Sequence, residues 1–170
     1  MIDVVAIVCK ALEVLSAAGT TAAMDYGREV KGWSDYTGND YMAAMAVNDA
    51  MVAIPAAPNL ALMVKVLRND PVNGWAAMRD LACFAAHDFT RRGLDGEKFG
   101  RAGLEYWVVH WARGGGSSRD AAFRFGKSFD THQRYYREMV QPLLDSWLTV
   151  ACGHLEPVIE EHYEKYRAAA

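Results

Sequence analysis

The stretch Ala121–Arg134 reads AAFRFGKSFDTHQR and follows three consecutive glycines at positions 114–116. Its pattern predicts two short helices joined by a tight turn. Gly126 suits the turn, because glycine adopts a positive φ angle without a steric penalty. Ser128 can cap the second helix with its hydroxyl oxygen, so we expect that helix to run from residue 129 to about 141. The stretch therefore predicts a helical hairpin in the last third of the chain.

Apolar residues recur with helical spacing along the rest of the chain, whereas the alternation typical of strands is rare. The sequence therefore predicts an all-α fold. Gly19 is expected to end the first helix, and Asn39 or Asp40 to cap a later one. Pro142 and Pro157 fit the first turns of two C-terminal helices. The expected helices cover residues 4–19, 20–31, 40–54, 60–68, 73–91, 98–113, 117–125, 129–141, 142–152 and 155–167.

The composition is that of an ordinary globular protein. The chain has 170 residues, of which 52% are hydrophobic and 23% are charged, so it can bury a core without metals or disulfides. We expect one continuous compact domain. Within it, residues 1–113 form a helical core region, and residues 114–170 hold the hairpin and the C-terminal helices.

No apolar run approaches the roughly 20 residues that a membrane-spanning helix needs. The apolar start of the chain, MIDVVAIVCKALEV, is interrupted by charges and has no basic region before it, which argues against a signal peptide. The three cysteines are widely and irregularly spaced, which is not typical of a disulfide framework. We therefore expect a cytoplasmic protein that has no membrane partner.

The hairpin has the residue types that a helix-turn-helix requires. Such a motif needs a small residue where its first helix touches its second, a glycine in the turn and a cap before the second helix. Ala122, Gly126 and Ser128 supply these in order. Thr131 and Arg134 complete the spacing A-x-x-x-G-x-S-x-x-T-x-x-R. The stretch resembles the helix-turn-helix family of bacterial and phage proteins, in which this spacing recurs.

This resemblance implies a set of contacts with duplex DNA. Side chains near the start of the second helix would meet base edges in the major groove, while hydroxyls and arginines would meet the DNA backbone. The residues expected at base edges are Lys127, Phe129, Asp130, His132 and Gln133. Those expected at phosphates or along the backbone are Arg119, Arg124, Ser128, Thr131, Arg134 and Arg137.

The local charge agrees with contact to a polyanion. The whole chain has a formal net charge of −3, which argues against DNA binding over its entire surface. Between Arg113 and Arg137, however, there are six lysines or arginines and only two carboxylates, Asp120 and Asp130. Asp130 is unfavourable near phosphates. The segment is still net positive, so we expect duplex DNA to bind there.

A second resemblance includes residues that precede the hairpin. Tyr106-Trp107 and then Trp111-Ala112-Arg113-Gly114-Gly115 come before the helix-turn-helix. In this order, the region from Leu104 to Leu155 is similar to small phage antitermination proteins of the Q type. That resemblance implies a phage or prophage protein that loads at a DNA element, regulates transcription and acts with host RNA polymerase.

Metal binding and catalysis have less support in the sequence. Cys83 and His87 are four residues apart on one expected helix, and Cys152 with His154 could offer two more zinc ligands. The two pairs are about 65 residues apart and neither is a C-x-x-C knuckle, so we expect no cofactor. No nucleophile, base and orienting acid follow one another in a known order, so we expect no enzyme activity.

One other function remains open from the sequence. The basic segment from Arg113 to Arg137 can meet an acidic protein surface instead of DNA. In that case the chain is a helical interaction protein that binds and inhibits a host factor, in the manner of an anti-defence or anti-CRISPR inhibitor.

Overall fold

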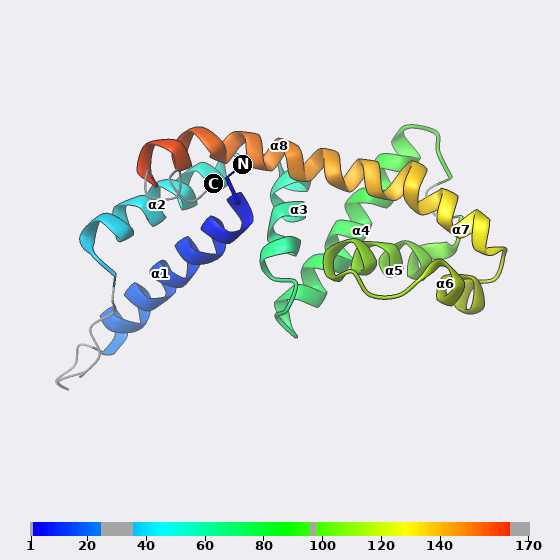
Figure 1. Ribbon diagram of the computed structural model, residues 1–170, viewed down its shortest axis with the longest axis horizontal. Coiled ribbons are helices and arrows are strands. Elements are labelled where there is room, and N and C mark those ends of the chain that lie inside the picture. The colour runs from blue at the N-terminus through cyan, green and yellow to red at the C-terminus, as the bar shows by residue number, and fades with distance from the viewer. Residues whose placement is uncertain (1, 25–35, 96–97, 164–170) are drawn as a thin grey trace. The chain divides into compact units, whose positions relative to one another are not determined.

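The computed structural model describes residues 2–24, 36–95 and 98–163, and for residues 18–24 it describes the backbone alone (Figure 1). These residues form helices and no strand, which confirms the predicted all-α class. They group into two compact units. One unit contains the chain up to Ile54 and from Ala151 onward, and the other contains Pro55–Val150. The predicted division after residue 113 does not coincide with either boundary, because residues 113 and 114 both lie in the second unit.

The first unit contains helix α1 (Val4–Met24), helix α2 (Gly38–Val52) and the end of helix α8 (Gln141–His162). α1 packs on α2, and both helices bury aliphatic side chains, among them Val8 and Val47. Burial of such side chains stabilises each by roughly 1.5–3 kcal/mol. In the described part of the whole chain, no helix is both long enough and apolar enough to cross a bilayer.

Two predicted helix boundaries in this region are wrong. The first helix passes through Gly19 and ends at Met24, because an interior glycine costs only about 1 kcal/mol relative to alanine and no proline follows it. The helix predicted for residues 20–31 therefore begins as part of α1, and residues 25–31 lie outside the described chain.

The start of α2 is fixed by two reciprocal hydrogen bonds. The Thr37 hydroxyl oxygen accepts from the Asp40 backbone N–H at 3.3 Å, and an Asp40 carboxylate oxygen accepts from the Thr37 N–H at 2.9 Å. This arrangement is a capping box. The cap is therefore Thr37, and the prediction of Asn39 or Asp40 is wrong, because Asp40 belongs to the first turn.

The second unit is built from consecutive helices around one core. Its elements are α3 (Ala56–Val66), α4 (Asn73–Arg91), α5 (Gly100–Arg113), α6 (Ser118–Phe125), α7 (Phe129–Tyr135), the π-helical segment η1 (Tyr136–Val140) and the start of α8. α4 packs on both α3 and α5, α6 packs on α5 and α7, and η1 returns to α5. Because α5 contacts so many of its neighbours, it is the central helix of this unit.

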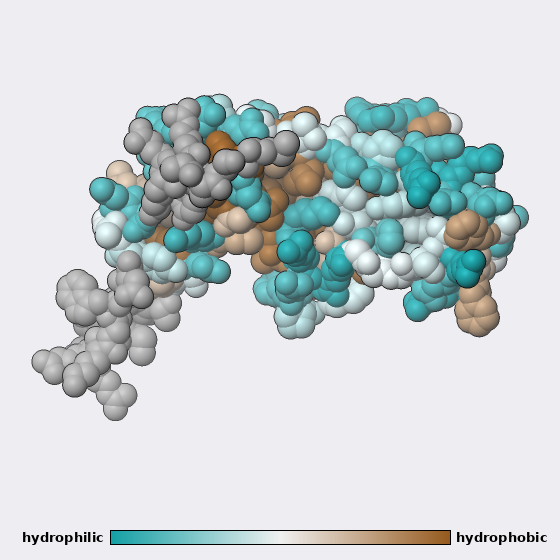
Figure 2. Space-filling model, viewed as in Figure 1, coloured by the Kyte–Doolittle hydropathy of each residue, from teal (hydrophilic) through white to brown (hydrophobic). Residues whose placement is uncertain are grey.

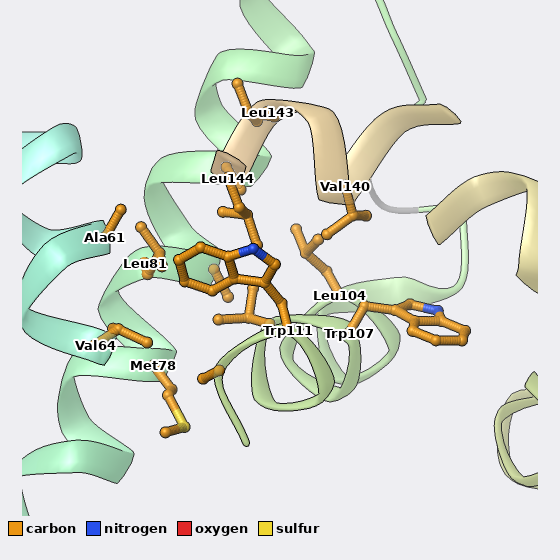
Figure 3. Packing of buried hydrophobic residues seen from close by; sticks show 14 of the residues in the cluster. Ala61, Val64, Met78, Leu81, Leu104, Trp107, Trp111, Val140, Leu143 and Leu144 are labelled. Carbon is orange, nitrogen blue, oxygen red and sulfur yellow. The ribbon is translucent and has the colours of Figure 1, made fainter. Parts of the chain in front are cut away.

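Aromatic and aliphatic side chains fill the core around α5. Figure 3 shows the Trp111 ring between Leu144 and the side chain of Leu81. The Trp111 indole N–H donates to Asp145 Oδ1 at 2.8 Å, and the Lys65 ammonium donates to the Trp111 carbonyl at 2.6 Å. Burial lowers the pKa of Lys65, although the negative charge of Asp145 opposes this effect. These polar contacts fix the register of α3, α5 and α8 in the core.

Helix α4 has the predicted bounds, but its neighbours differ in detail. Helix α3 begins at Ala56, earlier than expected, because Pro58 lies in its first turn and the missing amide donor costs little there. Trp75 on α4 is 46% exposed. Its ring packs against the Arg113 guanidinium, which lies 4.5 Å from the ring centroid.

The prediction of two separate C-terminal helices is wrong, because α8 is continuous. Pro142 follows η1, in which the Gln141 N–H donates to the Tyr136 carbonyl five residues earlier. This wider turn lets the chain pass a proline without the usual clash against the preceding turn. Pro157 lies inside α8, and its missing hydrogen bond is offset by the burial of neighbours such as Ile159.

Candidate nucleic-acid interface

Helices α6 and α7 form the predicted hairpin at one end of the second unit (Figure 1). Ser117 and Ser128 are the N-caps, and each hydroxyl accepts from the backbone N–H three residues later, at 3.1 and 3.2 Å. Between the helices, Gly126 has φ 72° and ψ −172°, a conformation that essentially only glycine adopts. Lys127 follows with φ 67°. The predicted turn at Gly126 and cap at Ser128 are confirmed.

The glycine loop before α6 is held against α5. The Tyr106 hydroxyl accepts from the Ser117 N–H at 2.7 Å and lies 2.9 Å from the Ser117 carbonyl. One turn along α5, His110 Nδ1 lies 2.6 Å from the Gly115 carbonyl. Gly116 has φ 81°, and a Cβ atom there would come within 2.3 Å of the Tyr106 hydroxyl. The loop therefore fixes where α6 begins, and Tyr106 and His110 position it. The sequence pointed to Tyr106 only as part of a resemblance and did not indicate this role for either residue.

Each helix of the hairpin has an inner face. On α6 the fully buried residue is Ala121, whereas Ala122, which was expected at the contact between the helices, is half-buried. The Phe125 ring meets the Tyr106 ring edge-on, with 5.7 Å between centroids. On α7, Tyr135 is buried. These contacts leave the opposite faces of both helices open to solvent.

His132 belongs to the inner face of α7, so the prediction that it meets a base edge is wrong. The side chain is 0% exposed and stacks on Phe99 with 3.9 Å between ring centroids. Its Nε2 lies 2.7 Å from the carbonyl oxygen of Gly126, so this nitrogen carries the proton and donates to the turn. His132 thus stabilises the turn and cannot enter a groove.

Three predicted DNA contacts are exposed cations on the hairpin, within which we include the segment η1 that continues α7. Arg119 lies on α6, Lys127 in the turn and Arg137 in η1, and all three are exposed. Within the described residues, none has a carboxylate within ion-pair distance. Their charge is therefore available for a negatively charged partner.

Two further predicted contacts are exposed arginines with a carboxylate four residues away in the chain. Arg124 pairs with Asp120 at 3.1 Å, and Arg134 pairs with Glu138 at 3.9 Å. Exposed pairs at this spacing are worth only about 0.3–0.5 kcal/mol, so phosphates can compete for these arginines. Arg113 is different, because its Nε donates to the Arg68 carbonyl at 2.6 Å in addition to its contact with Trp75.

The hydroxyls of Ser128 and Thr131 lie 2.8 Å apart and are hydrogen-bonded to each other. Both line a hollow of about 450 Å³ beside α7, to which Arg134 also contributes. Its other lining residues are Lys98, Asp130, Tyr135, Glu138 and Met139. The structure thus brings these three predicted backbone contacts to one place. Of the predicted base contacts, Phe129 and Asp130 are exposed and Gln133 is half-buried.

Phe123 was not among the predicted site residues, and it is 90% exposed. Figure 2 shows brown, apolar side chains standing among teal, hydrophilic ones over α6 and α7. The signal in the sequence is that Phe123 and Phe125 are two apart, so one helix cannot turn both rings toward the same core. Phe125 packs on Tyr106, which leaves Phe123 facing solvent.

The weak zinc candidates do not meet in the described part of the chain. No three potential ligands among His, Cys, Asp and Glu converge there. The Cys83 thiol donates to the Arg79 carbonyl at 3.1 Å and also contacts the Arg101 guanidinium, while His87 is exposed on the same helix. Cys152 and His154 lie on the stretch of α8 that belongs to the first unit.

Known proteins offer no counterpart from which a role could be transferred. No protein-family model matches the chain, and neither a curated protein nor a solved structure is significantly similar to it. The function of the chain is therefore inferred from the geometry and charge of the hairpin.

Proposed function

We propose that this chain is a DNA-binding regulator of transcription that contacts duplex DNA through the α6–α7 hairpin. The observation that carries the proposal is the set of exposed cations on the capped hairpin, Arg119, Lys127 and Arg137, none paired with a described carboxylate. The chain as a whole has a net charge of −3. A local positive face on a negative molecule directs a polyanion to one place on its surface.

Rigid mounting of the hairpin also supports contact with a regular duplex. Tyr106 holds the start of α6, and His132 holds the turn, so the exposed cations sit on a fixed frame. With His132 buried, the remaining base-reading candidates are Lys127, Phe129, Asp130 and Gln133. A glutamine can make two hydrogen bonds to adenine in the major groove, which makes Gln133 the residue we assign to sequence reading.

We also propose host RNA polymerase as a partner, because the chain resembles Q-type antitermination proteins. Two elements of that pattern are Tyr106, which binds the Ser117 N–H from α5, and the glycines Gly114 and Gly115, which lie in the loop before the hairpin. If the hairpin binds DNA, those residues orient it toward the DNA. Co-purification of the chain with RNA polymerase on a DNA fragment tests this partner.

Paired variants test DNA binding directly. Arg119→Ala and Arg137→Ala each remove one unpaired cation from the hairpin, and Arg79→Ala removes an exposed arginine from α4 as a matched control. If each arginine meets a phosphate, the two hairpin variants weaken binding to all duplex sequences and reduce the salt slope by about 1 each. Arg79→Ala leaves both unchanged. Equal weakening by all three variants would refute a specific role for the hairpin.

A second candidate is a helical interaction protein that inhibits a host factor. The observation that favours it is an open hollow of about 500 Å³ between α3 and α4, lined in part by Leu60, Met63 and Phe84. Phe84 is 42% exposed, and exposed aromatic rings are common anchors of protein interfaces. Under this candidate, a partner stays bound after nuclease treatment and is lost from Phe84→Ala.

A further inference from the structure

Phe123 is the most exposed of the large apolar side chains in the described chain, at 90%. It lies in the last turn of α6, two residues after buried Ala121 and two before Phe125. Since α6 already places Phe125 against Tyr106, the fold does not need a second phenylalanine on this helix. The Phe123 ring is therefore free to meet a partner.

The surroundings of Phe123 are cationic. Arg119 is one helical turn earlier on the same face of α6, Arg124 is its neighbour, and Lys127 follows in the turn. A second exposed aromatic, Phe129, begins α7. Nucleic acid is the partner that offers both an anion for each cation and a flat π-face for each ring. An acidic protein surface supplies the anions but has no regular supply of such faces.

We propose that Phe123 stacks on an unpaired base of DNA while the neighbouring cations hold the flanking phosphates. The inference rests on the proposed DNA-binding function and makes its ligand more specific. Every base presents a π-face, so stacking of this kind tolerates any sequence. A base inside a paired duplex must first leave its stack, whereas a base in an unpaired stretch has already done so. The chain therefore prefers DNA that contains a short unpaired stretch over the same DNA fully paired.

Two DNA probes and four proteins test this preference. The probes are a mixed-sequence duplex of about 30 base pairs and the same duplex with about three central mismatches, and binding is followed by fluorescence anisotropy. The proteins are the wild type, Phe123→Ala, Phe123→Trp and Phe84→Ala. Phe84→Ala makes the same change at an exposed phenylalanine that belongs only to the protein interface of the second candidate and not to the proposed DNA contact. Wild type should bind the mismatched duplex at least about fivefold more tightly than the paired one.

The variants then test whether the preference for mismatched DNA depends on the aromatic ring at position 123. Phe123→Ala should bind both duplexes with the affinity that wild type has for the paired one, while Phe123→Trp and Phe84→Ala keep the wild-type preference. A 2-aminopurine base placed among the mismatches gives a second measurement, because stacking against the ring changes its fluorescence. That change should occur with wild type and be absent with Phe123→Ala.

The possible failures are distinguishable. If wild type binds the paired duplex but shows no preference, or if Phe123→Ala retains the preference and the 2-aminopurine signal, the stacking inference is wrong and the proposed function stands. If wild type binds neither duplex at low salt, the proposed function and this inference both fail. If Phe123→Ala keeps the wild-type binding to both duplexes and instead loses a protein that co-purifies with wild type, Phe123 is a protein contact and the inference is likewise wrong.

Discussion

The imidazole Nε2 of His132 lies 2.7 Å from the carbonyl oxygen of Gly126, so a side chain of α7 closes the turn that introduces α7. The same ring stacks on Phe99 and is fully buried. A residue that the sequence suggested as a DNA contact is therefore part of the frame of the hairpin. The proposed DNA contacts depend on this frame, because it fixes the positions of Lys127 and Gln133.

Replacement of His132 by alanine should destabilise the second unit. The change leaves a cavity beside Phe99 and removes the donor to Gly126, and such losses in a core cost about 2–5 kcal/mol. Urea unfolding followed by circular dichroism measures this cost. Gln133→Ala, at the neighbouring half-buried position, is the control and should change the free energy of unfolding by less than about 1 kcal/mol. Equal stability of the two variants would show that the His132 contacts are dispensable.

Gly126 and Gly115 should respond in opposite ways to alanine. Gly126 has φ 72° and ψ −172°, where a side chain costs about 1–3 kcal/mol. Gly115 has no positive φ, and no atom lies within 4 Å of the place that a Cβ would take there, so alanine should be neutral or stabilise by up to about 1 kcal/mol. Thermal unfolding of both variants measures the difference. A stable Gly126→Ala protein would contradict the turn geometry.

Lys127→Gly should separate the charge of Lys127 from its backbone strain. A left-handed φ of 67° costs a residue with a side chain about 1–2 kcal/mol, which glycine relieves at an entropic cost of about 0.4–1 kcal/mol. The variant should therefore be as stable as wild type or slightly more so, yet bind DNA more weakly. Arg137→Gly removes the same charge from a helical position and should lose about 1 kcal/mol of stability. Comparable destabilisation of both would rule out strain at Lys127.

Tyr106→Phe should show how strongly the glycine loop is held. The change removes the hydrogen bond from the Ser117 N–H and should cost about 1 kcal/mol near neutral pH. Burial is the main cause that raises the pKa of Tyr106 above its usual value of 10.0. Because the folded-state pKa is the higher one, this contribution is complete below about pH 10 and is lost as the pH rises through the folded-state pKa.

Measurements at alkaline pH are the control for Tyr106→Phe. The difference in unfolding free energy between wild type and Tyr106→Phe should shrink above about pH 10. Tyr136, whose pKa burial also raises, is present in both proteins and cancels in the comparison. A difference that is constant from neutral to alkaline pH would mean that Tyr106 does not contribute through its protonated hydroxyl.

The turn and the cap of the hairpin could be predicted from the sequence because they depend on local chemistry. A glycine that needs positive φ and a serine that can cap a helix act on their own neighbours, so Gly126 and Ser128 could be identified from the sequence. The burial of His132 could not, because it depends on stacking against Phe99, a residue that is distant in the sequence. The contact of Tyr106 with Ser117 also could not, because it joins α5 to the N-cap of a different helix, α6.

Helix boundaries were less predictable where tertiary packing overrides local preference. Proline at 142 lies in the first turn of α8, as predicted, but proline at 157 suggested a second helix start and α8 continues through it. A π-helical turn before Pro142 and buried side chains such as Leu155 offset the local cost. Glycine at position 19 likewise failed to end α1.

The salt dependence of duplex binding by the wild-type protein tests the central claim most directly. Contact of three or more hairpin cations with phosphates predicts that log Kobs falls against log salt concentration with a slope of about −3 or steeper. The measurement is an anisotropy titration of a mixed-sequence duplex at several salt concentrations. A slope near zero, or no binding even at low salt, would contradict the account.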